Sequence, residues 1–146
     1  MVLFLVRRGT PLSADDAWRR LTGWERHADV VPLTRVRVVT LPPRGEGTVF
    51  VARTGVGRLA FDDRMEVVVW RPPRDGTPGL CRLVKRGRLV VGWAEIEVRP
   101  APEGGSRVVW REELGVRGLP RAFDPLLERA GRWMFGRAVK GLLARP

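Results

Sequence analysis

From residue 36 to residue 116 the chain repeats one pattern, in which apolar and β-branched residues alternate with polar ones between turns rich in glycine and proline. A period of two residues places every second side chain on the same face of an extended strand, so the pattern predicts antiparallel strands joined by short turns. We expect six strands, at 36–41, 48–54, 58–70, 80–86, 89–99 and 107–116. Strands that follow one another in this way form a meander, and a curved antiparallel sheet is therefore the main constraint on the fold.

Two short helices are predicted between a first strand at 2–7 and the meander. Ser13 is a good N-cap, and two aspartates follow it in the first turn, where negative charge suits the helix dipole. Gly23 ends this helix, and a second helical stretch at 24–30 stops before Pro32. The chain therefore begins with a strand and a pair of helices.

A long helix is predicted over residues 120–143, with Pro120 suited to its first turn. At 100° per residue, the apolar face of this helix consists of Phe123, Leu127, Ala130, Met134, Ala138 and Gly141. We expect this face to cover the sheet. The small residues Ala138 and Gly141 either let the helix approach the sheet closely or leave room beneath it.

The length of 146 residues fits one domain, residues 1–146, and no apolar run approaches the roughly 20 residues of a transmembrane helix. One cysteine, Cys81, and one histidine, His27, provide neither an internal disulfide nor a zinc site. No glycine-rich loop opens a helix in the manner of a nucleotide-binding loop. We therefore expect no metal and no cofactor, and the single cysteine fits a reducing cytoplasm.

The formal charge of +11 comes from arginine, because only Lys85 and Lys140 of the 27 basic residues are lysines. Such a charge permits a surface that binds nucleic acid, a ribosome or an anionic membrane. The densest basic group, at 82–88, has no aromatic residue interleaved that could stack on bases. We therefore favour a solvated arginine-rich surface, which leaves a nucleic-acid partner disfavoured but open.

The strand phase selects the candidate polar residues of a binding site. Pairing of Thr54 with Arg58 across the turn at 55–57 predicts that Arg53 and Asp63 face inward. The inward series is then Val49, Val51, Arg53, Leu59, Phe61, Asp63, Met65, Val67 and Val69. An inward carboxylate can serve as a general base or accept a hydrogen bond from a ligand. The alternative is a structural ion pair, for which Arg53 is the plausible partner of Asp63.

In the last strand the inward series Val108, Trp110, Glu112 and Leu114 turns Glu112 toward the same interior. Strands three apart lie about 14 Å apart at about 4.8 Å per strand, which is too wide for Glu112 and Asp63 to work as an acid–base pair. His27 has no nucleophile in a compact motif beside it and fits a packing role better than catalysis. No catalytic residue is predicted.

Several short motifs, taken with the order of elements, resemble one known superfamily. They are Ala17-Trp18, Trp24-Glu25-Arg26-His27, Gly45-Glu46-Gly47-Thr48, Phe61-Asp62-Asp63-Arg64-Met65, Val69-Trp70-Arg71-Pro72-Pro73 and the stretch from Gly104 to Trp110. The chain is similar along its whole length to the SRPBCC or START-like superfamily, which groups START lipid-transfer domains, birch-pollen-allergen proteins, polyketide cyclases and coenzyme-Q-binding proteins. The resemblance implies a bacterial member with an α+β helix-grip fold. In that fold a curved antiparallel sheet of about seven strands wraps around a long C-terminal helix, with two short helices after the first strand.

The resemblance further implies a cavity between sheet and helix that binds, and in some members transports, a small hydrophobic molecule such as a lipid, isoprenoid or polyketide. The residues we expect to contact that ligand are Asp63, Arg53, Glu112, Phe61, Met65, Trp110, Met134 and Ala138. An aromatase/cyclase-type enzyme using the same cavity is the first alternative, and a basic interaction protein at a ribosome or anionic membrane is the second. The lack of a compact nucleophile–base motif favours binding over catalysis.

Overall fold

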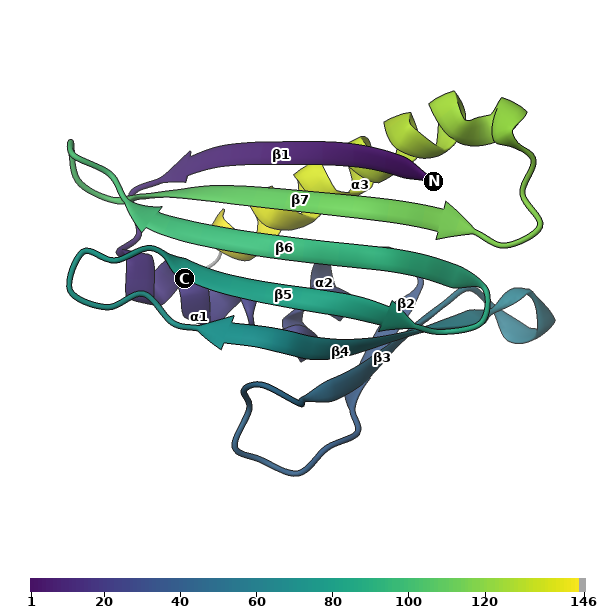
Figure 1. The fold of residues 1–146 in the computed structure, drawn as a ribbon, viewed down its shortest axis with the longest axis horizontal. Helices are drawn as coiled ribbons and strands as arrows, with labels where there is room; N and C mark the ends of the chain where they lie inside the picture. Colours follow the sequence, from purple (N-terminus) through teal and green to yellow (C-terminus); the bar gives the residue numbers. More distant parts are fainter. Residues whose placement is uncertain (145–146) are drawn as a thin grey trace.

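Seven antiparallel strands form one sheet in the computed structural model, which describes residues 1–144 (Figure 1). The strands are β1 (Val2–Thr10), β2 (Thr34–Val38), β3 (Val49–Thr54), β4 (Phe61–Arg71), β5 (Gly79–Arg86), β6 (Val90–Pro100) and β7 (Ser106–Val116). Their order in the sheet is β1-β7-β6-β5-β4-β3-β2, so β2 to β7 form the predicted meander and β1 joins it beside β7. The predicted α+β helix-grip architecture is confirmed.

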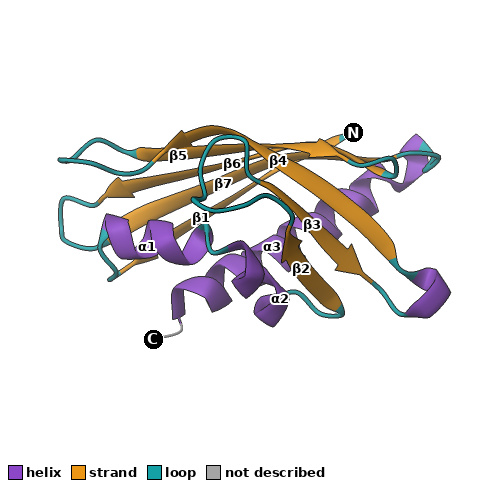
Figure 2. Cartoon of the chain, turned by 90° about the horizontal axis from the view of Figure 1, so that it is seen from below, coloured by secondary structure: helices purple, strands orange, loops and turns teal. Residues whose placement is uncertain are grey.

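The helices are α1 (Ala14–Leu21), η1 (Trp24–Arg26), α2 (His27–Val30), η2 (Gly57–Leu59), η3 (Arg121–Phe123) and α3 (Asp124–Ala144). The helices α1, α2 and α3 lie on one side of the sheet, whereas the short helix η2 belongs to the hairpin between β3 and β4 (Figure 2). Ser13 caps α1 as predicted, because its side-chain oxygen accepts a hydrogen bond from the backbone N–H of Asp16 at 3.1 Å. None of these helices is long and apolar enough to cross a membrane.

The hairpin between β3 and β4 differs from the predicted one. Thr54 pairs with Phe61, not with Arg58, because residues 57–59 form the turn η2 and take no part in the ladder. Gly55 has a φ of 116°, and a side chain there would lie 2.4 Å from the carbonyl oxygen of Leu59, so this tight connection requires glycine. The longer loop shifts the pairing of the two strands and reverses the face predicted for β3.

A β-bulge in β4 corrects a second prediction. Val67 lies opposite Leu83, but beyond the bulge it is Trp70 that lies opposite the buried Cys81. The extra residue in one strand changes the alternation of faces, so Trp70 packs against the core where Val69 was expected.

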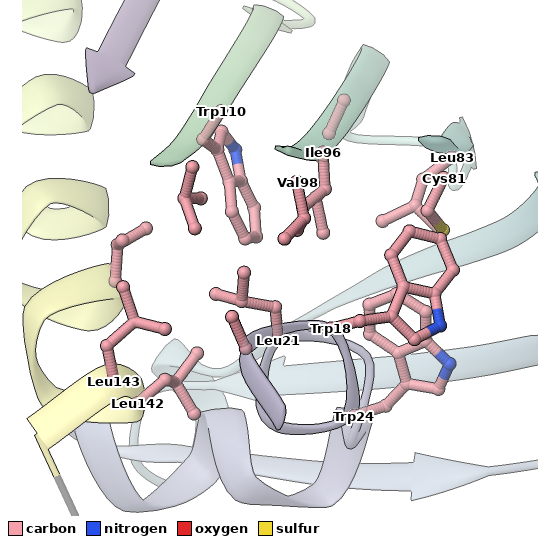
Figure 3. Packing of buried hydrophobic residues seen from close by; sticks show 14 of the residues in the cluster. Trp18, Leu21, Trp24, Cys81, Leu83, Ile96, Val98, Trp110, Leu142 and Leu143 are labelled. Atoms are coloured by element: carbon pink, nitrogen blue, oxygen red, sulfur yellow. The ribbon is translucent and has the colours of Figure 1, made fainter. Parts of the chain in front are cut away.

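The main hydrophobic core lies between the sheet and the helices (Figure 3). It brings the short N-terminal helices, the strands and the end of α3 together, through residues that include Trp18, Leu21, Trp24, Ile96, Val98, Trp110, Leu142 and Leu143. The ring centroids of Trp24 and Phe50 are 4.5 Å apart in a stacked arrangement. This cluster holds α1 and the C-terminal half of α3 against the sheet.

The buried face of α3 is rotated relative to the predicted one. Ala138 is buried as expected, but Ala130 is exposed, and 48% of Phe123 is exposed. Gly131 takes the contact position instead, because α3 approaches β1 so closely that a Cβ atom there would lie 2.6 Å from the ring of Phe4. The residues of α3 that are buried are Gly131, Ala138, Val139, Leu142 and Leu143.

Candidate ligand-binding cavity

A cavity of about 250 Å³ lies between the concave face of the sheet and α3. Its walls are mostly apolar and come from β2 to β7, the segment around α2, and the middle of α3. Residues on these walls include Val36, Phe50, Ala52, Phe61, Met65, Leu83, Val90, Leu114, Leu127, Met134 and Phe135. Beside the cavity, Trp18 and Leu21 of α1 pack in the hydrophobic core against the sheet, and neither residue lines the cavity.

Asp63 faces the cavity as the strand phase predicts, but its partner is Lys85. The Lys85 ammonium donates to Asp63 Oδ2 at 2.6 Å, and the lysine side chain is only 2% exposed. Lys85 turns inward because it continues the buried series Gly79, Cys81 and Leu83 along β5. The sequence contained this signal, although we had grouped Lys85 with the neighbouring surface arginines.

Glu112 is 1% exposed and also lines the cavity. Burial raises its pKa to about 7; the nearby charge of Lys85 opposes this rise, and that of Asp63 reinforces it. Burial lowers the pKa of Lys85, but the negative charges of Glu112 and Asp63 outweigh that effect and raise it. Asp63, Lys85 and Glu112 therefore form one electrostatically coupled group, which we call the buried charge cluster.

The small inward residues of β6 make this coupling possible. Asp63 on β4 and Glu112 on β7 are three strands apart, as predicted, and Lys85 on β5 lies between them in sheet order. Gly92 pairs with Lys85, and Ala94 pairs with Glu112. Neither residue places a bulky side chain between the ammonium and the carboxyl group.

Several buried polar atoms on the cavity wall have no hydrogen-bond partner within residues 1–144. They are Asp63 Oδ1, Glu112 Oε2 and the indole nitrogens of Trp24 and Trp110. The indole of Trp110 is close enough to Glu112 to lower its pKa slightly, without completing a hydrogen bond by geometry. A buried polar atom left unpaired costs about 1–3 kcal/mol, so these atoms are candidates for contacts with a bound molecule.

No protein-family model and no curated protein matches the chain. Solved structures do match. The human StarD13 lipid transfer and protein localization domain has a TM-score of 0.75 at 11% identity, over 99% of this chain and 78% of that one. Ara h 8.0201 has a TM-score of 0.63 at 13% identity, over 99% of both chains. The chain shares the helix-grip fold of these structures.

Another protein with this helix-grip fold is an enzyme. Norcoclaurine synthase from Thalictrum flavum, in complex with dopamine and hydroxybenzaldehyde, has a TM-score of 0.63 at 14% identity, over 97% of this chain and 85% of that one. The helix-grip fold thus serves lipid transfer in one protein and synthesis in another. Identities this low establish the fold, and the site must be interpreted from its own residues.

The structure places the predicted contact residues of this helix-grip domain unequally. Six of the eight lie on the cavity wall, namely Phe61, Asp63, Met65, Trp110, Glu112 and Met134. Arg53 does not: it is 57% exposed and donates to Asp62 at 3.2 Å on the outer face, because the hairpin register turns Ala52 inward in its place. Ala138 is buried, with 1% of its surface exposed, but it does not line the cavity.

His27 lines the cavity as a neutral ring. Its Nε2 lies 2.8 Å from the carbonyl oxygen of Leu21, and since a carbonyl only accepts, Nε2 carries the proton. Burial lowers the pKa of His27, with the backbone hydrogen bond opposing the shift. The ring centroids of Trp24 and Trp110 lie 5.6 and 5.9 Å from that of His27, so the histidine packs among aromatic side chains.

Neither the thiol nor the carboxyl groups of this domain suit a nucleophile or a metal centre. Burial raises the pKa of the Cys81 thiol to about 12, which keeps it protonated and unreactive at neutral pH. Within residues 1–144 no three His, Cys, Asp or Glu side chains are grouped so that they could hold a metal ion. In the buried charge cluster Lys85 already occupies the place of a cation beside Asp63.

Proposed function

We propose that the protein binds a small, mostly apolar molecule in the cavity between the sheet and α3. The observation that carries this proposal is the cavity itself, about 250 Å³ of apolar-walled space that the core side chains leave open. Sites for small molecules begin at about 300 Å³, so the volume suits a ligand of modest size, such as a short alkyl chain or a small aromatic compound. A lipid with two long acyl chains exceeds it.

The polar atoms on the cavity wall support the proposal that the ligand binds in one orientation. We propose that Asp63 and Glu112 meet its polar end, while Phe61, Met65, Trp110 and Met134 contact its apolar body. Arg53 and Ala138 are not part of the proposed site because neither lines the cavity. The buried, unreactive Cys81 fits a reducing compartment, and we propose that the protein acts in the cytoplasm.

Proton-transfer catalysis on a molecule in the same cavity, of the aromatase/cyclase kind, is the second candidate function. One observation favours it, the buried carboxyl group of Glu112 on the cavity wall. Burial raises the pKa of Glu112 to about 7, and a carboxyl group that titrates near neutral pH can both accept and return a proton. Turnover of a copurified ligand, measured with and without Glu112→Gln, distinguishes this candidate from binding alone.

Binding is tested with 1-octanol as an apolar probe and with the intrinsic fluorescence of the protein, because Trp24 and Trp110 line the cavity. Ala52→Phe fills the cavity from β3, and Val51→Phe places the same side chain on the opposite face of the same strand. We expect the wild type and Val51→Phe to bind 1-octanol and Ala52→Phe to lose binding. Equal affinity in all three proteins, or no binding by the wild type, contradicts the proposal. If the expected binding is found, native mass spectrometry of the purified protein identifies the natural ligand.

A further inference from the structure

The charges inside the cavity have the opposite balance to those of the whole protein. The chain carries a formal charge of +11, yet no arginine among residues 1–144 lines the cavity. The residues on its wall that can carry a charge are Asp63, Lys85, Glu112 and the neutral His27. The wall thus combines two carboxyl groups with one ammonium.

The ammonium in this cluster is already neutralised. Lys85 donates to Asp63 Oδ2 at 2.6 Å, and its next contact is the sulfur of Met65 at 3.8 Å. Glu112, in contrast, is 1% exposed and has an oxygen, Oε2, with no hydrogen-bond partner within residues 1–144. An anionic ligand would find the ammonium of Lys85 already paired and two carboxyl groups nearby, whereas a cationic ligand would find an unpaired acceptor.

We propose that the cavity selects a cationic amine, that is, a primary or secondary ammonium on a small apolar body, with the ammonium donating to Glu112 Oε2. The unpaired Oδ1 of Asp63 provides a second acceptor on the same wall. This inference rests on the proposed binding function and specifies its ligand class. The cavity would thus bind a positively charged group, whereas the arginine-rich outer surface repels one.

The affinity for such a ligand depends on pH through Glu112, whose pKa is about 7. Below this pH the carboxyl group is protonated and no longer attracts an ammonium, so the preference for amines strengthens as the pH rises through about 7. The charged groups that act on Glu112 are Lys85 from β5 and Asp63 from β4. Its strand partners Phe4 and Ala94 are uncharged. The neutral His27 and the side chains of Leu127, Met134 and Phe135, which line the same cavity, carry no charge either.

The test uses octylamine, 1-octanol and octanoate, which match in chain length and are cationic, neutral and anionic at about pH 8. Affinities are measured by calorimetry, and any binding that persists in Ala52→Phe is subtracted as surface binding. We expect octylamine to bind about tenfold or more tightly than 1-octanol at about pH 8, with octanoate the weakest, and we expect this advantage to shrink toward about pH 6.

Glu112→Gln keeps the shape of the side chain and removes its charge. We expect this variant to lose the affinity advantage of octylamine over 1-octanol, together with the pH dependence of that advantage. Glu113→Gln is the matched control, because the neighbouring residue points to the opposite face of β7, and it should behave as the wild type.

Asp63→Asn provides an independent variant, since it removes the counterion of Lys85 and should shift the preference from octylamine toward octanoate. Asp62→Asn on the outer face is its control. If 1-octanol binds but octylamine binds no more tightly, or octanoate binds most tightly, the amine proposal is overturned and the binding function stands. If none of the three probes binds, both are overturned.

Discussion

Glu112 shows at the residue scale how a cavity wall can hold an ionisable group that a close-packed core would exclude. The carboxyl group is 1% exposed, and one of its oxygens is unpaired within the described chain. Burial raises its pKa from an ordinary 4.5 to about 7, so the folded protein holds a proton that the unfolded chain releases. A group kept at such a cost is typical of functional sites, where pKa values are shifted for a task.

The stability of the protein should therefore depend on pH through Glu112. Because the folded-state pKa is the higher one, the contribution of the protonated carboxyl is fully present below about pH 4.5 and is lost as the pH rises to about 7. We expect Glu112→Gln to be more stable than the wild type by about 3 kcal/mol above pH 7, and the difference to vanish near pH 4.5.

This difference is measured by urea unfolding of both proteins across that range. His27 acts in the opposite direction, because its lowered pKa reduces stability as the pH falls, but it is present in both proteins and cancels. Glu113→Gln should track the wild type. A constant difference between Glu112→Gln and the wild type across the range contradicts the assignment.

At the scale of elements, the contact between α3 and β1 determines how the long helix lies on the sheet. Gly131 sits against the ring of Phe4, which in turn stacks on Phe135 with centroids 5.6 Å apart. A glycine at this point lets the helix approach the strand closely. The next residues along the cavity side, Met134 and Phe135, then form part of the wall, so the close contact at one point positions the lining at another.

Alanine substitutions at two glycines of α3 should distinguish the effect of close packing on stability from the effect of helix propensity. Gly131→Ala would place a Cβ atom 2.6 Å from Phe4, and we expect it to destabilise the protein by about 1–3 kcal/mol. Gly136→Ala meets no atom within 4 Å and should stabilise the protein by about 0.5–1 kcal/mol, because alanine is the better helix former. Thermal unfolding measures both. Stabilisation by Gly131→Ala would show that α3 does not pack closely on β1.

The whole molecule separates a polar outer face from an apolar inner one. On the outer face Arg82 donates to Glu95 at 2.7 Å, and Arg111 lies 3.5 Å from both Glu95 and Glu97. The guanidinium of Arg82 also lies 4.4 Å from the ring centroid of Trp93. These arginines are engaged with neighbours on the sheet, which favours the interpretation of the basic charge as a solvated surface.

Nucleic-acid binding should accordingly be nonspecific and sensitive to salt. We expect RNA and DNA to bind weakly at low ionic strength, through general phosphate neutralisation by the excess of +11, and to dissociate near about 0.2 M salt. Fluorescence anisotropy with labelled oligonucleotides across a salt series measures this. Tight, sequence-dependent binding that persists at about 0.2 M salt would instead support a nucleic-acid or ribosomal role.

Much of the architecture was predictable because it depends on local patterns. The alternation between turns predicted the strands, Ser13 predicted the start of α1, and strand phase turned Glu112 and Asp63 inward. The face to which a strand residue points depends only on its near neighbours, since successive side chains along a strand point to opposite faces. This alternation even contained the signal for Lys85, which continues the buried series of β5.

The remaining features depended on contacts between segments far apart in the chain. The turn η2 and the bulge after Val67 reset the faces of β3 and β4, because one residue added to a loop or strand reverses every side chain beyond it. The partner of Asp63 could not be read from its own strand, since Lys85 belongs to the next one. The rotation of α3 was determined by the fit of Gly131 against Phe4. The sequence alone thus determined which elements form and which way most residues point, while only the tertiary structure decided which charges meet and where the cavity remains open, because both depend on the packing of surfaces that are distant in sequence.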